Sequence, residues 1–199
     1  MTDRYHNFEQ LKKKERPDHF TIFEHRGSTG VAIIAPHGGG IETGTSEIAK
    51  GIAGQEHTLY CFEGKRPSKN GDLHITSTKF DEPNAIEIVK QADKVVAIHG
   101  CADKKDVIYL SGLDEELKNR IRKSLIVAGF RVEEPATSSM QGIHLSNICN
   151  RGKSKCGVQV EISEGLRRIM FEDHTKRAGR EVTKFAFNRF VTAIREAIG

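Results

Sequence analysis

The chain has 199 residues, of which 37% are hydrophobic and 29% charged, so we expect one globular domain with a packed core rather than a disordered chain. Its 31 Lys and Arg residues exceed its 27 Asp and Glu residues by four, and this mild basicity permits a polyanionic partner without requiring one. No apolar stretch approaches the ~20 residues needed to cross a bilayer, which excludes a membrane-spanning protein.

The N-terminal segment and the cysteines both indicate synthesis in the cytoplasm. Residues 1–20 are polar and charged and lack the apolar region of a secretory signal. The four cysteines show no C-x-x-C spacing, so we expect free thiols that are mostly buried.

Hydrophobic patterning predicts strands that alternate with helices. Residues 31–35 are continuously apolar, and residues 94–98 are apolar after the initial Lys94, as in strands covered on both faces. Further strands are expected at residues 20–26, 58–62, 73–77, 107–110, 130–133 and 158–162, and helices at 5–15, 45–53, 81–92, 113–128 and 180–198. The alternation predicts an α/β fold, a single domain with a mixed, mostly parallel sheet flanked by helices. Residues 1–19 would form a helical extension before a domain at 20–199.

The motif H-G-G-G-I-E, residues 37–42, follows the first apolar strand, where α/β sheets commonly bind ligands. Imidazole and carboxylate groups both ligate Zn²⁺, and three glycines allow a tight turn that brings both side chains to one point. Taken alone, the motif is equally compatible with a glycine-rich turn that carries a surface histidine.

His99 follows the apolar strand at 94–98 in the same way, so His37, Glu42 and His99 are expected at one edge of the sheet. Three protein ligands with an open fourth position are typical of a catalytic zinc. Alternation along V-Q-V-E-I-S places three polar side chains on one face of the next strand. That face is either an exposed strand edge or the floor of a site, and in a site Glu161 is the natural general base.

The polar segment 136–156 is expected to be a long loop that carries Asn150 and Arg151. An amide beside a guanidinium fork suits a carboxylate ligand, and the alternative is a solvated loop. Other classes are not favoured, because the chain lacks the G-x-S-x-G elbow of lipases and the G-K-[ST] of a P-loop. Its basic runs are short and without interleaved aromatic residues, so we expect no nucleic-acid partner.

Four motifs as a set resemble one known family: PHGGGIE, LHITSTKFDEP, AIHG and NICNRGKSKCGVQVEISEGLR. They resemble the poly-γ-glutamate hydrolases of Bacillus phages and their bacterial homologues, over residues 20–198. The resemblance implies a zinc peptidase similar to the carboxypeptidase A and N-formylglutamate amidohydrolase group. Residues 20–199 would then be a zinc hydrolase domain with a zinc-carboxypeptidase-like fold.

The resemblance also implies roles for matching residues: His37, Glu42 and His99 as zinc ligands, Glu161 as the catalytic glutamate, and Asn150 with Arg151 as the pair that binds a substrate carboxylate or the oxyanion. The carboxypeptidase pattern is H-x-x-E, whereas four residues separate His37 from Glu42 here, so Glu47 is kept as a second candidate of lower rank. His74 is expected to contact substrate or donate a proton.

The expected activity is cleavage of γ-glutamyl amide bonds in poly-γ-glutamate by a zinc-activated water, with Glu161 moving the proton and Arg151 stabilising the oxyanion. Because each polymer unit carries a free carboxylate, a cationic groove is expected, with candidates Arg66, Arg122, Arg151, Lys153 and Arg167.

We expect a monomer that acts on this anionic polymer, without a membrane partner. The N-terminal segment fits a phage enzyme released by host lysis and a cytoplasmic bacterial homologue equally well. One alternative is a zinc-dependent deacylase of a small N-acylglutamate, which would have a closed pocket. The other is a non-enzymatic phage accessory protein that binds nucleic acid.

Overall fold

The computed structural model of the protein describes residues 3–135, 137 and 140–199. The α-helices are α1 (Phe8–Lys14), α2 (Thr45–Ala53), α3 (Pro83–Gln91), α4 (Glu115–Val127), α5 (Glu164–Met170), α6 (Arg177–Glu181) and α7 (Phe185–Ile198). The strands are β1 (Phe20–His25), β2 (Val31–Gly39), β3 (Thr58–Gly64), β4 (Lys94–Cys101), β5 (Ile108–Gly112), β6 (Val132–Glu133) and β7 (Val158–Ser163). Short 3₁₀ turns lie at η1 (Pro17–His19), η2 (Asn70–Leu73) and η4 (Ile148–Arg151).

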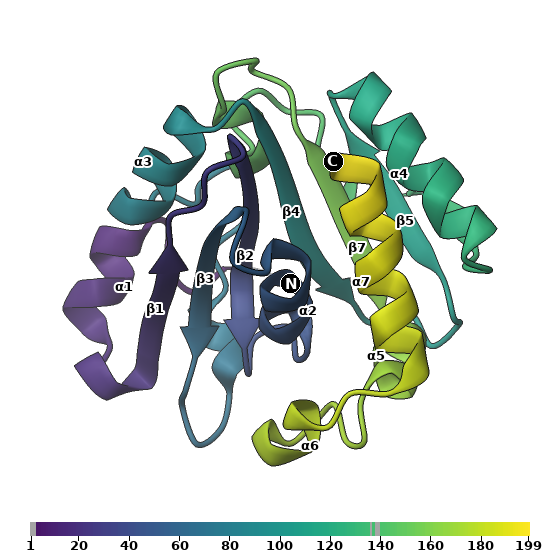
Figure 1. The fold of residues 1–199 in the computed structure, drawn as a ribbon. Helices are drawn as coiled ribbons and strands as arrows, with labels where there is room; N and C mark the ends of the chain where they lie inside the picture. The colour runs from purple at the N-terminus through teal and green to yellow at the C-terminus, as the bar shows by residue number, and fades with distance from the viewer. Residues whose placement is uncertain (1–2, 136, 138–139) are drawn as a thin grey trace.

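The strands form a mixed sheet of seven in the order β1-β3-β2-β4-β7-β5-β6 (Figure 1). At its centre β3, β2, β4 and β7 pair in parallel, whereas β1 and β5 run antiparallel to β3 and β7. The predicted α/β fold with a mixed sheet flanked by helices is confirmed. Because the central strands are parallel, their carboxyl ends meet at one edge, which is where such sheets bind ligands.

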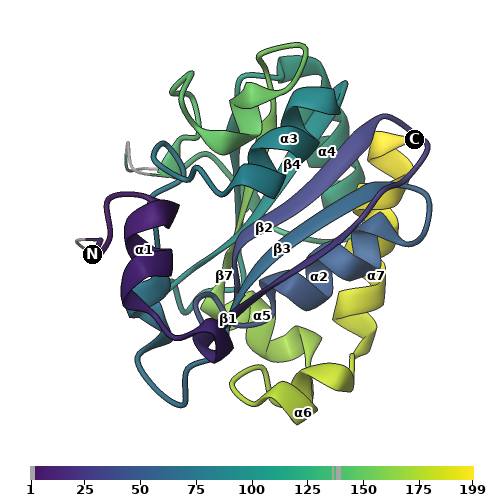
Figure 2. The ribbon, with the colours of Figure 1, turned by 90° about the vertical axis from the view of Figure 1, so that its left-hand side faces the viewer.

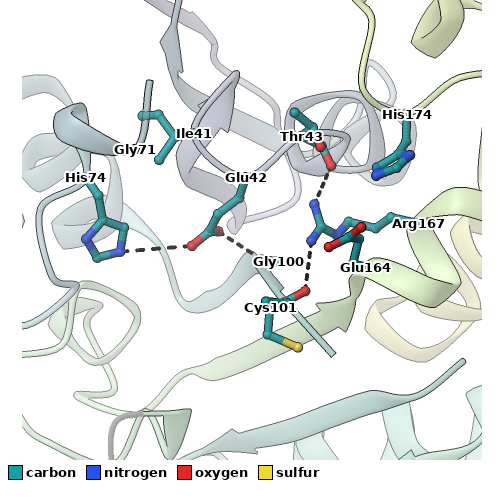
Figure 3. Close-up of a pocket in the computed structure, with 11 residues that line it drawn as sticks. Ile41, Glu42, Thr43, Gly71, His74, Gly100, Cys101, Glu164, Arg167 and His174 are labelled. Atoms are coloured by element: carbon teal, nitrogen blue, oxygen red, sulfur yellow. Dashed lines mark hydrogen bonds and ion pairs between the residues drawn. The ribbon is translucent and has the colours of Figure 1, made fainter. Parts of the chain in front are cut away.

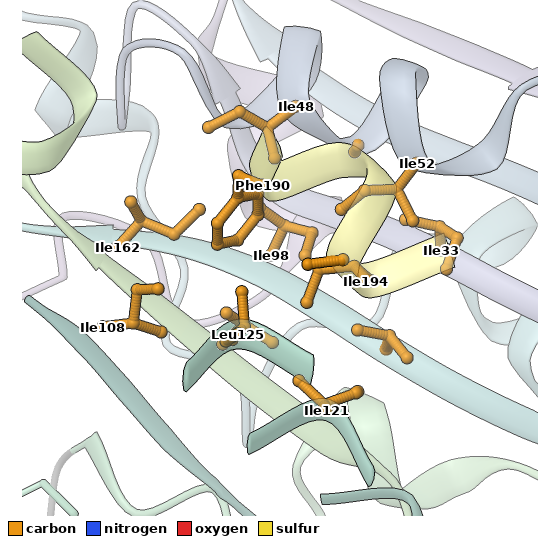
Figure 4. Close-up of a cluster of buried hydrophobic side chains, with 14 of the residues drawn as sticks. Ile33, Ile48, Ile52, Ile98, Ile108, Ile121, Leu125, Ile162, Phe190 and Ile194 are labelled. Atoms are coloured by element: carbon orange, nitrogen blue, oxygen red, sulfur yellow. The ribbon is translucent and has the colours of Figure 1, made fainter. Parts of the chain in front are cut away.

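Helices cover both faces of this sheet, as the turned view in Figure 2 shows. Side chains of α2, α4, α5 and α7 pack with alternate residues of the strands in the larger hydrophobic cluster (Figure 4). Ile48 and Ile52 of α2 and Phe190 and Ile194 of α7 are fully buried there. Burial of each such side chain contributes about 1.5–3 kcal/mol to folding. A second cluster lies on the opposite face, beneath α1 and α3.

The segment before β1 packs against this second cluster. Tyr5, Phe8 and Leu11 are buried, and the Phe8 ring meets the rings of Phe20 and Phe62 edge-on, with centroids 5.9 and 6.1 Å apart. The helix predicted near the N-terminus is present as α1. The predicted boundary between an N-terminal extension and the domain lies after residue 19, although side chains before it pack in the same hydrophobic cluster as the sheet. Residues 1–2 of the extension lie outside the described part of the chain.

The strand predicted at 73–77 is wrong, because η2 ends at Leu73 and the following residues pair with no strand in the described sheet. The alternation that suggested a strand has another cause. Leu73 and Ile75 are buried in the second cluster and Ser77 is buried after them, while His74 is partly exposed and Thr76 is exposed. An irregular segment that packs every second side chain thus produced a strand-like pattern.

Two helical features also differ from expectation. The helix predicted from residue 180 is divided into α6 and α7, because Thr183 forms a β-bridge with Phe171 between them. Helix α5, which follows β7 directly, was not predicted, and it contains Gly165, a residue that disfavours helix. A Cβ at Gly165 would lie 2.3 Å from the Lys104 carbonyl oxygen, so close packing explains the glycine. Within the described ranges, no helix is both long and apolar enough to cross a membrane.

Candidate metal centre

His37 lies on β2 at a bulge that turns its side chain toward the second cluster. Up to Ala35 the odd-numbered residues of β2 pack in the larger cluster, and the register with β3 shifts between Ala35 and Gly38. Such bulges re-aim side chains. The His37 ring lies edge-on to Phe80, with centroids 6.2 Å apart, and its Nε2 lies 2.8 Å from the Ile75 carbonyl oxygen. Without the bulge, alternation would direct His37 into the opposite core.

His99 and Glu161 come from the neighbouring strands β4 and β7. Their parallel register pairs the two residues directly, so both side chains leave the sheet on one face. Ala97, two residues before His99, belongs to the second cluster, so this face is the one to which His37 points. Both side chains are buried, and His99 Nε2 lies 3.4 Å from the Ser77 hydroxyl oxygen.

Glu42 stands on the glycine-rich turn after β2. Gly39 has a φ of +64°, and a Cβ there would lie 2.5 Å from the Gly64 carbonyl oxygen, so the turn requires glycine. The Glu42 N–H donates to the His37 carbonyl oxygen over 2.8 Å and closes the turn. The Gly100 N–H donates to Glu42 Oε2, also over 2.8 Å, so the end of β4 holds the carboxylate.

His37, Glu42 and His99 converge as the sequence predicted. His37 Nδ1 lies 3.1 Å from both Glu42 Oε1 and His99 Nδ1, and one ligand atom of each residue lies within 4.8 Å of the others. A carbonyl oxygen only accepts hydrogen bonds, so the His37 Nε2–H donates to Ile75, and Nδ1 is the ring nitrogen that faces Glu42 and His99. A carbonyl partner that fixes the tautomer in this way is typical of metal-ligating histidines.

The charges in this cluster depend on one another. Burial acts to raise the pKa of Glu42, but the imidazoles of His37 and His99 hold it well below its ordinary value. Burial acts to lower the pKa of His99, but the carboxylates of Glu42 and Glu161 together outweigh burial, so the pKa of His99 is raised. A partly buried, ionised carboxylate beside two imidazoles provides the charge and the donor atoms that a divalent cation requires.

Glu161 lies beside the cluster, and most of its side chain is buried. Burial raises its pKa to about 7, which makes its carboxylate a stronger base than an exposed one. Gln159 Nε2 donates to Glu161 Oε1 over 3.0 Å, and Gln159 is itself held by the Asn147 amide over 2.9 Å. Among the described residues, the second carboxylate oxygen of Glu161 has no hydrogen-bond partner, so it is free to meet a water or a substrate.

His74 lies against the cluster through an interaction that sequence patterns did not reveal. Its Nδ1 lies 2.8 Å from the carboxylate of Asp3, its Nε2 lies 4.0 Å from Glu42 Oε1, and its ring is 4.0 Å from the His37 ring, between centroids. Burial lowers the pKa of His74 to about 4, so the ring is neutral near pH 7. Since a carboxylate accepts hydrogen bonds, Nδ1 carries the proton and Nε2 presents a lone pair to the cluster.

A cavity of about 790 Å³ opens over the cluster. Its described lining consists of His37, Glu42, His74, Thr76, Ser77, Thr78, His99, Gln141, Gly142, Ile143, His144, Asn147, Gln159 and Glu161. A second hollow of about 380 Å³ shares Glu42 and His74 with it and is also lined by Arg167 (Figure 3). The cluster therefore stands between two adjoining hollows.

Asn150 and Arg151 are close to the cavity but are not among its described lining residues. The Asn150 amide donates to the carbonyl oxygens of Gly142 and His144 over 2.7 and 3.0 Å. The Arg151 guanidinium donates to the carbonyl oxygens of Ser146, Thr78 and Phe80. Both side chains thereby hold the loop that forms one wall of the cavity, and their predicted contact with substrate stays a prediction.

The expected cationic groove is not formed by the candidates named from the sequence. Three of them are held in ion pairs: Arg66 with Asp72, Arg122 with Glu134 and Lys153 with Asp93. The described lining of the larger cavity contains no lysine or arginine, and Arg167 faces only the second hollow. Glu47, the carboxylate of lower rank, pairs with Arg180 at 2.9 Å and is not part of the cluster.

Comparison with known proteins identifies the family of the chain. The poly-gamma-glutamate hydrolase family model matches residues 5–193. The SPbeta prophage-derived UPF0714 protein YoqZ of Bacillus subtilis (strain 168) is 40% identical over 92% of this chain, which spans 66% of that relative, just under two thirds of its length. A solved bacteriophage poly-gamma-glutamate hydrolase is 36% identical with a TM-score of 0.94, over 99% of this chain and 97% of that one. A zinc-free structure of YNDL is 32% identical with the same TM-score, over 99% and 98%. The chain therefore belongs to the poly-gamma-glutamate hydrolase family.

Proposed function

We propose that the protein is a zinc-dependent hydrolase that cleaves the γ-glutamyl amide bonds of poly-γ-glutamate. The observation that carries the proposal is the convergence of His37, Glu42 and His99 at the floor of a cavity that also contains Glu161. A similar protein of solved structure is a poly-gamma-glutamate hydrolase, and the zinc-free description of another supports zinc as the metal.

The donor atoms fit zinc. Two imidazole nitrogens and one carboxylate are a ligand set found in catalytic zinc sites, which keep a further position open. When bound, zinc would polarise the amide carbonyl and lower the pKa of a water toward ~7. The Ile75 carbonyl and the Gly100 N–H orient His37 and Glu42 for this task.

Glu161 is proposed as the general base and acid. Its unpartnered carboxylate oxygen accepts the proton of the attacking water, and the carboxyl group returns that proton to the leaving amine. The raised pKa suits both steps, because a group with a pKa near the working pH exchanges a proton in either direction. Gln159 fixes the other oxygen, so the side chain keeps one orientation through the reaction.

The shape of the site favours a polymer over a small N-acylglutamate. A chain crossing the cluster can occupy the larger cavity on one side of Glu42 and His74 and the second hollow on the other. In the larger cavity the neutral side chains of Ser77 and Gln141 could donate to substrate carboxylates. Asn150 and Arg151 contribute by holding the wall of this cavity.

The test is an incubation of zinc-loaded protein with poly-γ-glutamate, with chain length followed by size-exclusion chromatography. We expect shortening that a chelator abolishes and that Glu161→Gln slows by a factor of about 10²–10⁴ while zinc stays bound. Glu172→Gln, which alters an exposed carboxylate, is the matched control and should keep the wild-type rate. A polymer left intact while a small N-acylglutamate is hydrolysed would contradict the substrate assignment.

The active form is proposed to be a monomer that meets its polymer after host lysis. The similarity to a prophage-derived relative supports the connection with a phage. Sedimentation of the zinc-loaded protein at working concentration tests the monomer, and a dimeric species would contradict it.

A further inference from the structure

Arg167 lies beside the metal cluster, on α5, with its guanidinium buried among backbone carbonyl groups. Only 5% of the residue is exposed. Its Nη1 donates to the Thr43 carbonyl oxygen over 2.6 Å, its Nη2 to that of Cys101 over 2.9 Å, and its Nε to that of Ile162 over 3.1 Å. Figure 3 shows the two Nη bonds reaching in different directions from one planar group.

The three accepting carbonyl groups belong to the three segments that build the site. Each lies one or two residues after a proposed functional side chain: Thr43 after Glu42, Cys101 after His99 and Ile162 after Glu161. One side chain therefore ties the glycine-rich turn, the end of β4 and the end of β7 to each other. A shift of any of these segments would break a hydrogen bond to a charged donor, which is stronger than a neutral one.

Gly100 shows how closely the guanidinium fits. A Cβ at Gly100 would lie 2.8 Å from Arg167 Cζ and 3.0 Å from both Nε and Nη1, so the planar group rests directly on the β4 backbone. The N–H of the same Gly100 holds the carboxylate of Glu42. Displacement of the guanidinium would thus disturb the residue that positions a metal ligand.

The charges and contacts around Arg167 favour a role in holding backbone segments together over direct binding of a substrate carboxylate. Arginine is seldom fully buried unless it is paired, yet no carboxylate oxygen among the described residues lies within 4.0 Å of this guanidinium. Burial lowers the pKa of Arg167, while the carboxylates of Glu42, Glu164 and Glu161 act to raise it. Three of its five N–H donors are already committed to the backbone.

We propose that Arg167 is a positioning residue that sets the spacing of the metal donors by cross-linking the segments that carry Glu42, His99 and Glu161. The inference rests on the proposed function, because it assumes that the cluster binds zinc. This positioning role differs from the contact with substrate that the sequence predicted for Arg167.

The test compares Arg167→Lys with Arg168→Lys, the same change at the exposed neighbouring position. Lysine keeps the charge but cannot direct hydrogen bonds to three carbonyl groups from one planar group. Competition with a chromophoric chelator should show a loss of zinc affinity of about 10–100-fold for Arg167→Lys and none for Arg168→Lys. At saturating zinc, kcat on poly-γ-glutamate should fall while KM stays within about threefold of the wild-type value.

Gly100→Ala gives an independent perturbation if Arg167→Lys does not fold. It retains Arg167 and every N–H donor, and its methyl group pushes the guanidinium away, so zinc affinity should fall here too. Unchanged zinc affinity in both folded variants, or a KM increase above about tenfold with kcat preserved, would overturn the inference. The affinity measurements need no substrate, so a protein that binds zinc without cleaving the polymer would contradict the proposed function and leave this test intact.

Discussion

Replacement of Glu161 by glutamine should stabilise the metal-free protein at alkaline pH, although it removes the proposed base. Burial raises the pKa of Glu161 to about 7, from an ordinary value of 4.5. The folded state therefore favours the protonated carboxyl group, and its ionisation opposes folding. Glutamine is neutral at every pH, and its amide oxygen can accept the same hydrogen bond from Gln159.

The magnitude follows from the difference between the folded and unfolded pKa values. The cost of ionisation is absent below the unfolded value, grows as the pH rises and is complete above the folded value. At 1.36 kcal/mol for each pKa unit, wild-type stability should lie below that of Glu161→Gln by about 1.5 kcal/mol at about pH 5.5. At about pH 8.5 the difference should reach about 3 kcal/mol, or roughly 6–12 °C in Tm.

Urea denaturation in the presence of a chelator, at both pH values, measures these differences directly. Glu87→Gln removes an exposed carboxylate on α3 and serves as the control, for which we expect little change with pH. Equal stabilities of Glu161→Gln and wild type at about pH 8.5, or a less stable variant, would show that burial does not raise the pKa of Glu161 in the folded protein.

Three further outcomes are expected. Zinc at about 100 times its dissociation constant should stabilise the wild type by about 2.7 kcal/mol in thermal denaturation and should leave His99→Gln unchanged, so an equal shift in both would contradict the ligand assignment. Asp3→Ala should lower kcat and shift the His74 ring away from the Nδ1–H tautomer in nitrogen-15 NMR spectra, because it removes the carboxylate that holds this proton; an unchanged tautomer would argue against that role. Arg151→Lys should destabilise the protein by about 2–4 kcal/mol in urea denaturation, since it loses hydrogen bonds to loop carbonyls, with KM within about threefold of wild type. A large KM increase at unchanged stability would instead restore the substrate contact predicted from the sequence.

The convergence of His37, Glu42 and His99 was predictable because parallel strands end at a common edge and glycines permit a tight turn. Glu161 was predictable because period-two alternation exposes it on one strand face. The resemblance to a known family then supplied the roles of these residues and the name of the polymer. What the pattern could not supply was the bulge in β2, since continued alternation would have turned His37 away from the site.

Long-range contacts account for most of what the sequence did not reveal. Asp3 meets His74 across 71 positions in the chain, and no local motif indicates such a pairing. Arg151 was expected to bind substrate because a guanidinium group suits a carboxylate. In the structure its N–H groups donate to backbone carbonyl oxygens. Arg167 was expected near the site and is there, yet its three carbonyl partners come from distant segments.

The dependence of cleavage on zinc is best tested by a zinc titration of the metal-free protein in which bound metal and the rate of γ-glutamyl bond cleavage are measured together. We expect no cleavage before zinc is added, and we expect the amount of bound zinc and the cleavage rate to rise in parallel to saturation at about one zinc for each chain. Full cleavage in the metal-free protein, or an unchanged rate after the site is filled, would contradict this dependence.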